Sequence, residues 1–316
     1  MQRREWLKGL CAVAMLGGCA GLPRKTASRD GFFAQRKLAI GIQLYTLAQA
    51  AAADLDGTFA SLAGIGYGAV ELAGLMGKSP AQVRASADRA GLKLTSFHIP
   101  AESRAPGDLS LASDAGSLAA DLHMLGISRV AMPIFRIPKR LGVMQSGEGF
   151  LAFLTRIAPH LTADDWKRDA ALLNEKGVAL AREGIELGYH NHNPEFAPLG
   201  GATGFEILMR ETDPSIFFEM DAGWVAAAGL SPIELLRRYP GRFRMMHVKD
   251  ILPSTRPNFV LQQNPTEVGK GLIDWSVLLD AAFDAGVRDF FVEQEPPFTM
   301  DRLAALKISH DYLARL

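Results

Sequence analysis

The sequence has very little cysteine, and what it has lies at one end. Cys11 and Cys19 are the only cysteines among 316 residues, so the chain beyond them cannot form an internal disulfide bond. An excess of charge of one sign is also absent, because 34 Lys and Arg balance 34 Asp and Glu. A general nucleic-acid binder needs a basic footprint, and we therefore expect no nucleic-acid partner.

The beginning of the chain lacks an apolar run long enough to span a membrane. Arg3 and Arg4 precede a short apolar run at 9–16, well below the roughly 20 residues that a spanning helix needs. This arrangement resembles the twin-arginine export signal. We therefore predict that residues 1–18 are a signal peptide and that the protein is exported to the periplasm.

Cys19 follows Leu16-Gly17-Gly18, which resembles the lipobox of a lipoprotein signal. We predict that Cys19 is lipidated and attaches the protein to a membrane; a soluble signal cut near Ala20 or later is the alternative. Residues 19–36 are rich in Gly, Ala, Ser, Arg and Lys and are predicted to be a flexible tether. Residues 37–316 then form one domain, because a single (β/α)8 barrel typically needs about 250 residues.

The last third of the chain contains four apolar runs that each end in acids or histidines, at 184–196, 215–224, 243–250 and 289–295. Each run is separated from the next by a segment long enough for one helix. Alternation of strand, polar end and helix predicts the α/β class and a (β/α)8 TIM barrel with its chemistry at the carboxyl ends of the strands.

The same alternation extends over the whole domain. Strands are predicted at 38–45, 68–72, 93–98, 129–132, 186–190, 216–220, 245–248 and 290–293. The helices between them include 80–90, which follows Ser79 as cap and ends before Gly91, and one from Thr162 to about 183. Segment 134–161 is longer than a barrel connection needs, so we predict a lid on the catalytic face.

Acids, a histidine and a lysine at these strand ends occur in pairs two residues apart. Such pairs point to the same side of a strand, and they are Glu219 with Asp221, His247 with Lys249, and Glu293 with Glu295. Oxygen and imidazole groups that converge from several strands can hold one divalent ion, and this donor set suits Mn, Mg, Co or Zn.

Several motifs in chain order carry a family resemblance: Tyr189-His190-Asn191-His192-Asn193-Pro194-Glu195-Phe196, Asp221, His247-Val248-Lys249-Asp250, Gly269-Lys270-Gly271-Leu272-Ile273-Asp274-Trp275 and Val292-Glu293-Gln294. They resemble the sugar phosphate isomerase/epimerase family, whose xylose-isomerase-like barrel also occurs in inosose dehydratase and the ketose 3-epimerases. The resemblance covers about residues 38–316. It implies one divalent metal ion held by Glu195, Asp221, His247 and Glu293.

The fifth strand departs from the family pattern. Many relatives carry the ligand carboxylate within that strand, where this chain has Tyr189 and His190. Either Glu195 reaches back to the metal, or His190 or His192 replaces it; we favour Glu195.

The resemblance and the strand ends together assign roles to the remaining residues. Glu195 and Glu293 form the proton-transfer pair, and Lys249 polarises a substrate oxygen or neutralises the acids. A sugar substrate is expected to contact residues near the same strand ends, namely His98, His192, Trp224, Glu295 and Tyr45.

These assignments favour a metal-dependent sugar isomerase or epimerase that acts through an enediolate on a ketose or an oxidised, 3-keto sugar. The same enediolate could expel a group, so a lyase or hydrolase that cleaves 3-keto glycosides is one alternative. A non-catalytic periplasmic sugar-binding lipoprotein is another. A metal-dependent nuclease on this barrel is disfavoured by the neutral charge and by the small number of metal ligands.

Overall fold

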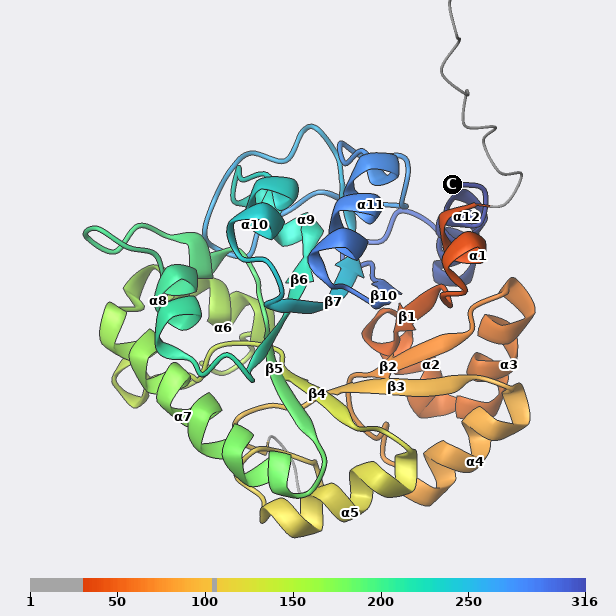
Figure 1. Ribbon diagram of the computed structural model, residues 1–316, viewed down its shortest axis with the longest axis horizontal. Helices are drawn as coiled ribbons and strands as arrows, with labels where there is room; N and C mark the ends of the chain where they lie inside the picture. The colour runs from red at the N-terminus through yellow and green to blue at the C-terminus, as the bar shows by residue number, and fades with distance from the viewer. Residues whose placement is uncertain (1–30, 104–106) are drawn as a thin grey trace, which may run out of the picture.

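The computed structural model describes residues 31–103 and 107–316, and it confirms the predicted barrel. Eight parallel strands close in the order β1-β10-β7-β6-β5-β4-β3-β2, surrounded by helices (Figure 1). The strands are β1 (Gly41–Gln43), β2 (Ala69–Leu72), β3 (Lys93–His98), β4 (Arg129–Met132), β5 (Glu186–His190), β6 (Phe217–Asp221), β7 (Phe243–Val248) and β10 (Asp289–Val292). A two-stranded antiparallel sheet, β8 (Asp250–Ile251) with β9 (Pro265–Thr266), follows β7.

Helices follow the barrel strands on the outside. They are α2 (Ala48–Ala53), α3 (Leu55–Ile65), α4 (Pro80–Ala90), α5 (Ala115–Leu125), α6 (Phe150–Ile157), α7 (Ala163–Arg182), α8 (Gly204–Glu211), α9 (Ala222–Ala227), α10 (Pro232–Arg238), α11 (Trp275–Ala285) and α12 (Arg302–Leu313). Predicted caps form as expected: Ser79 and Gln82 make a capping box on α4, and Gly91 ends it at φ 70°. Within the described ranges, no helix combines the length and the apolar character that a membrane span requires.

The first strand is shorter than the predicted 38–45. The chain leaves the extended conformation at Leu44, where the 3-10 helix η1 (Leu44–Leu47) begins. The side chain of Gln43 accepts a hydrogen bond from the Tyr45 backbone N–H and caps this helix. A side chain that satisfies the first backbone donor favours the helical turn over a longer strand.

The predicted flexible tether is wrong for its described part. Residues Phe32–Arg36 form the short helix α1, and both of its phenylalanines are buried. Phe32 and Phe33 pack edge-on against Phe290, with ring centroids 5.6 and 5.7 Å away. Burial of two aromatic rings stabilises this segment against the entropy of a free chain. The signal peptide, Cys19 and the rest of the tether lie outside the described residues, and export and lipidation stay predictions.

The floor of the barrel is filled by a few large side chains opposite small ones. Phe217, Met245 and Phe291 point inward and form a buried cluster with Ala131. Gly188 pairs with Phe217 across β5 and β6, and a Cβ atom on Gly188 would overlap the Phe217 ring. Interiors are packed closely enough that an added methyl group there must displace its neighbours.

Asp250 anchors the segment after β7. Its carboxylate accepts hydrogen bonds from the backbone N–H groups of Gly269 and Gly271 at 3.0 and 3.2 Å, and from the indole N–H of Trp275 at 3.0 Å. Gly271 must be glycine, because a Cβ atom there would meet the Asp250 carboxylate. Asp250, Gly269 and Gly271 of these two motifs therefore have a structural role: they hold the segment after β7 in place.

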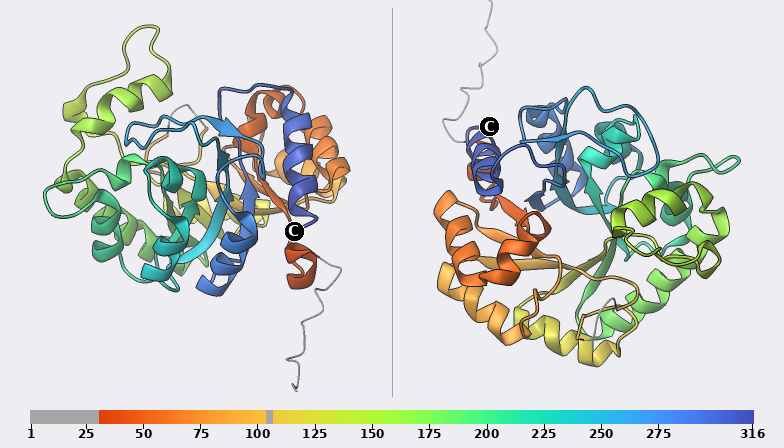
Figure 2. Two further views of the ribbon diagram at one scale, coloured as in Figure 1. Left: turned by 90° about the horizontal axis from the view of Figure 1, so that it is seen from above. Right: turned by 180° about the vertical axis from the view of Figure 1, so that it is seen from behind.

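The long segment after β4 lies on the face where the strands end. It contains η2 (Lys139–Leu141), α6 and η3 (Ala158–His160), and it stands out from the barrel on the opposite face from α1 (Figure 2). Asp169 of α7 holds the start of this segment, because its carboxylate accepts a hydrogen bond from the Arg136 backbone N–H at 3.1 Å. Burial raises the pKa of Asp169 to about 7.

We expect Gly188→Ala to lower the free energy of unfolding by about 1–3 kcal/mol, because the new methyl group would overpack the barrel floor against Phe217. Gly64→Ala in α3 is the control: nothing lies within 4 Å of its would-be Cβ atom, and alanine favours a helix by roughly 0.5–1 kcal/mol. Urea unfolding of both variants measures the difference. Equal stability of Gly188→Ala and the wild type would contradict the packing described for the floor.

The raised pKa of Asp169 leads us to expect that the stability of the protein depends on pH. Its pKa in the folded protein is about 7, above roughly 3.9 in an unfolded chain, so the folded state binds the additional proton. Stability from this group is complete below about pH 4 and is lost as the pH rises towards 7. We expect Asp169→Asn to reduce the fall in urea midpoint between about pH 5 and pH 7. Asp164→Asn, an exposed position on the same helix, should keep the wild-type slope.

Candidate active site

Inward-pointing pairs at the ends of three neighbouring strands form the site. β6 supplies Glu219 and Asp221, β7 leads to His247 and Lys249, and Glu293 and Glu295 follow β10. The two members of each pair lie two residues apart, so the alternation of a strand turns both to the interior. The three pairs lie close together in the structure, as the sequence predicted.

The deeper group, which we name the inner cluster, consists of Glu71, His98, His190, Glu219 and His247. Glu219 accepts hydrogen bonds from His98 Nε2 at 2.8 Å and His190 Nδ1 at 3.0 Å. Glu71 Oε2 accepts from His247 Nε2 at 2.7 Å. The carboxylates thus orient the imidazoles, and each fixes which ring nitrogen carries the proton.

Charge in the inner cluster is unevenly distributed. Burial raises the pKa of Glu71, and the nearby charge of Glu219 raises it further. Burial also acts to raise the pKa of Glu219, but the charge of His247 and hydrogen bonds from the histidines hold it well below its usual range. Burial lowers the pKa of His190 to about 4. His190 is therefore a neutral imidazole at neutral pH.

The group nearer the pocket, the outer cluster, consists of Asp221, His247, Lys249, Glu293 and Glu295. His247 Nδ1 lies 3.0 Å from Glu293 Oε2 and 3.7 Å from Asp221 Oδ2. Lys249 Nζ lies 2.8 Å from Asp221 Oδ2, 2.7 Å from Glu293 Oε2 and 3.2 Å from Glu295 Oε1. His247 belongs to both clusters and links them through its two ring nitrogens.

Lys249 is completely buried and carries a charge. Burial acts to lower its pKa, but Asp221 and Glu293 raise the pKa above its ordinary value. Its ammonium group also lies 5.1 Å from the centroid of the Trp224 ring. Lys249 does not line the pocket, so the structure places it where it neutralises the acids rather than where it touches a substrate.

The outer cluster suits a divalent cation by its donor chemistry. Ligand atoms of Asp221, His247 and Glu293 all lie within 4.8 Å of one another, and all three residues are buried. Two carboxylate oxygens and one imidazole nitrogen are a donor set that Mn, Co and Zn accept. Lys249 Nζ lies 2.8 and 2.7 Å from oxygens of these two carboxylates, so a bound ion would share them with the ammonium group.

Glu195, the preferred fifth-strand ligand, does not join either cluster. After His190 the chain turns into η4 (Pro194–Phe196), and the Tyr189 hydroxyl donates to Glu195 Oε1 at 2.7 Å. Tyr189 points outward from the barrel while His190 points inward, so Glu195 is held beside the outer residue. Glu195 therefore lies outside the group of Asp221, His247 and Glu293, and β5 contributes His190 to the inner cluster instead. Burial raises the pKa of Glu195 to about 7.

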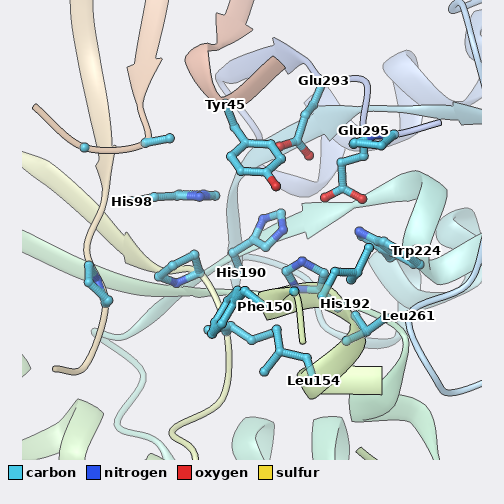
Figure 3. Close-up of a pocket in the computed structure, with 18 of the residues that line it drawn as sticks. Tyr45, His98, Phe150, Leu154, His190, His192, Trp224, Leu261, Glu293 and Glu295 are labelled. Atoms are coloured by element: carbon cyan, nitrogen blue, oxygen red, sulfur yellow. The ribbon is translucent and has the colours of Figure 1, made fainter. Parts of the chain in front are cut away.

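A cavity of about 560 Å³ opens above these clusters. All five predicted substrate contacts line it: His98, His192, Trp224, Glu295 and Tyr45. The close-up shows Glu293, Glu295 and Tyr45 on one side and the imidazole rings of His190 and His192 below them (Figure 3). His192 Nδ1 is buried and has no hydrogen-bond partner among the described residues, so it can bond to a ligand.

Sequence reasoning missed one member of the site, Glu71. Glu71 lies within the apolar strand β2, where Gln43 and Ser96 donate to it at 2.8 and 2.6 Å. An acid between Val70 and Leu72 was the available signal, since a buried charge needs partners. The predicted lid segment does line the cavity, through Phe150, Leu151 and Leu154 of α6.

Comparison with known proteins supports the fold. An inosose dehydratase from Lacticaseibacillus casei is 28% identical over 154 residues, which are 44% of this chain and 50% of the relative. The chain therefore matches about half the length of that protein. Two solved structures share the fold: a sugar phosphate isomerase/epimerase from Parabacteroides distasonis (23% identity, TM-score 0.68, covering 86% of this chain and 96% of the other) and an L-ribulose 3-epimerase (19%, 0.61, 87% and 93%).

The likeness to those two structures shows only a shared fold, because both are less than 25% identical to this chain. The family model matches a longer part of the sequence than the relative from L. casei does. The model described as xylose isomerase-like TIM barrel matches residues 59–316, most of the chain and all of the strands that supply the two clusters. This chain belongs to the xylose isomerase-like TIM barrel family.

Proposed function

We propose that this chain is a divalent-metal-dependent enzyme that moves a proton next to the carbonyl group of a sugar, as an isomerase or epimerase. The observation that carries the proposal is the placement of Asp221, His247 and Glu293 in one buried group beside a cavity of about 560 Å³, which Glu293 lines. Carboxyl and imidazole groups that face the cavity supply the proton-transfer chemistry.

Asp221, His247 and Glu293 would hold the metal ion. Bound there, the ion would act as a Lewis acid that polarises a substrate carbonyl and makes the neighbouring C–H bond more acidic. Glu71 positions His247, because it accepts a hydrogen bond from Nε2 and so turns Nδ1 to the side of Asp221 and Glu293. A metal ion would take the place of the proton on Nδ1. A carboxylate that orients a ligand imidazole in this way commonly strengthens metal binding.

Glu295 is the proposed proton-transfer group. Its carboxylate lines the cavity, and Gln263 Nε2 donates to Glu295 Oε2 at 2.8 Å while Lys249 lies beside Oε1. Burial raises the pKa of Glu295 to about 7, which suits a group that both takes up and returns a proton at neutral pH. His192 is held neutral by burial, which lowers its pKa well below the ordinary value, and it can bind a substrate hydroxyl.

A lyase that cleaves oxidised, 3-keto glycosides is the second candidate on the same residues. Loss of a proton next to the carbonyl is common to both reactions, and only the fate of the resulting enediolate differs. The relative from L. casei is named a dehydratase, which is an elimination. The apolar half of the cavity, described below, also favours a substrate with a leaving group larger than water.

Metal content tests the proposed ligand set. We expect Asp221→Asn to lower affinity for Mn, Co or Zn at least about tenfold, because it removes a charged ligand. Asparagine can still accept from the Trp224 backbone N–H and cap α9, and Lys249 keeps Glu293 and Glu295 as partners, so we expect the fold to be retained. Glu195→Gln is the matched variant and should bind metal like the wild type. Equilibrium dialysis with elemental analysis measures both; a loss confined to Glu195→Gln would restore the ligand set expected from the sequence.

Deuterium exchange tests the reaction. In D₂O, the metal-loaded protein should incorporate deuterium next to the carbonyl of at least one sugar in a panel of ketoses and 3-keto glycosides, followed by NMR. Glu295→Gln should slow this exchange by about 10²–10⁴-fold with metal content unchanged. Glu175→Gln, an exposed position on α7, serves as control. Exchange that proceeds equally well in Glu295→Gln would remove that residue from the mechanism, and no exchange with any sugar would contradict the proposed function.

A further inference from the structure

The cavity has two chemically different sides. Glu293 and Glu295 enter from one side in the close-up, while Phe150, Leu154 and Leu261 lie on the other, with the imidazole rings between them (Figure 3). The polar side adjoins the outer cluster. The apolar side is farther from the metal-ligand group, so a single ligand that fills the cavity must contact both.

The apolar side is assembled from segments that are far apart in the sequence. α6 contributes Phe150, Leu151 and Leu154, and the segments after β2, β3 and β4 contribute other apolar residues: Leu75, Pro100, Leu109, Pro133 and Ile134. Phe150 and Leu151 are 36% and 48% exposed, although both line the cavity. Apolar surface that stays exposed beside a polar site is typical of a ligand groove.

A free monosaccharide fits this side poorly. It carries a hydroxyl group on nearly every carbon, and each buried hydroxyl needs a hydrogen-bond partner that leucine and phenylalanine side chains cannot supply. A cavity of about 560 Å³ is also of a size that accommodates drug-sized ligands, roughly 300–1,000 Å³. The portion of the ligand against α6 is therefore apolar.

A neighbouring cavity makes the contrast clear. It has a volume of about 580 Å³, shares Leu151, Trp224, Leu261 and Glu295 with the first, and is otherwise lined largely by polar residues such as Ser254, Asn258 and Gln263. A second sugar unit would find hydrogen-bond partners there. Apolar lining is thus concentrated on the α6 side of the first cavity, while the residues that only the second cavity has are mostly polar.

We infer that the natural ligand is an amphiphilic glycoside: a sugar that carries an apolar substituent of at least about one aromatic ring, which lies against Leu151, Leu154 and Leu75. The sugar half of this inference rests on the proposed function. The substituent occupies the apolar side while the sugar ring reaches the outer cluster, and α6 selects substrates by the apolar group that they carry.

Binding of matched glycosides tests the inference without relying on turnover. Isothermal titration of the metal-loaded protein would compare methyl with phenyl β-D-glucopyranoside, the corresponding galactoside pair, and the 3-keto forms of the glucoside pair. In at least one pair the phenyl glycoside should bind about ten- to a hundredfold tighter, as expected for burial of one aromatic ring. Equal affinities within every pair, or no measurable binding of any compound, would overturn the inference.

Variants locate the substituent. Leu151→Ser and Leu75→Ser should each lower affinity for the phenyl glycoside several-fold and leave the methyl glycoside unchanged, whereas Val143→Ser is the control. Val143 is 82% exposed, lies in the same long segment as α6 and does not line the cavity. Wild-type affinity in both Leu variants would place the phenyl group elsewhere and refute the assignment. A phenyl preference without deuterium exchange would leave this inference standing while the proposed function fails, and exchange without the preference would do the reverse.

Discussion

The neutralisation of buried carboxylates is the constraint on which the rest of this structure depends. Glu71, Glu219, Asp221 and Glu293 lie inside the barrel with almost no access to water, where an unpaired charge would cost several kcal/mol. Each carboxylate is paired with a histidine or with Lys249. Because the partners come from β2, β3, β5, β6, β7 and the end of β10, the ion pairs fix the strands relative to one another. The site is thus held by charge across the barrel rather than by its loops.

The barrel separates stability from chemistry along each strand. Phe217 and Glu219 are two residues apart on β6, and the first fills the apolar floor while the second joins the inner cluster. Met245 and His247 divide β7 in the same way, as do Phe291 and Glu293 at the end of β10. Small residues such as Gly188 make room for the large side chains below, so the polar layer above is closed off from the opposite face.

Residues whose position follows from strand alternation were predictable from the sequence. The eight strands, and the grouping of Asp221, His247 and Glu293, depend only on period two and on parallel strands ending at one face. Glu195 could not be placed in this way, because the turn after His190 decides its direction and Tyr189 holds it outside the clusters. Glu71 could not be assigned to the site from the sequence, because its partners Gln43, Ser96 and His247 lie on three other strands. The tether prediction failed at α1 because Phe32 and Phe33 pack against Phe290. That contact joins residues far apart in the sequence, so no local pattern predicts it.

The position of α1 has a consequence for how the molecule can be held. Gly31, where the described chain begins, lies against the backbone of Leu316 at the other end, and α1 packs on the face opposite the projecting α6 segment (Figure 2). A fusion partner or a solid support joined at Leu316 is attached behind the barrel, on the face from which the chain before Gly31 also leaves. The mouth of the cavity then faces away from the point of attachment, and it stays open to solutes that arrive from the surrounding solution.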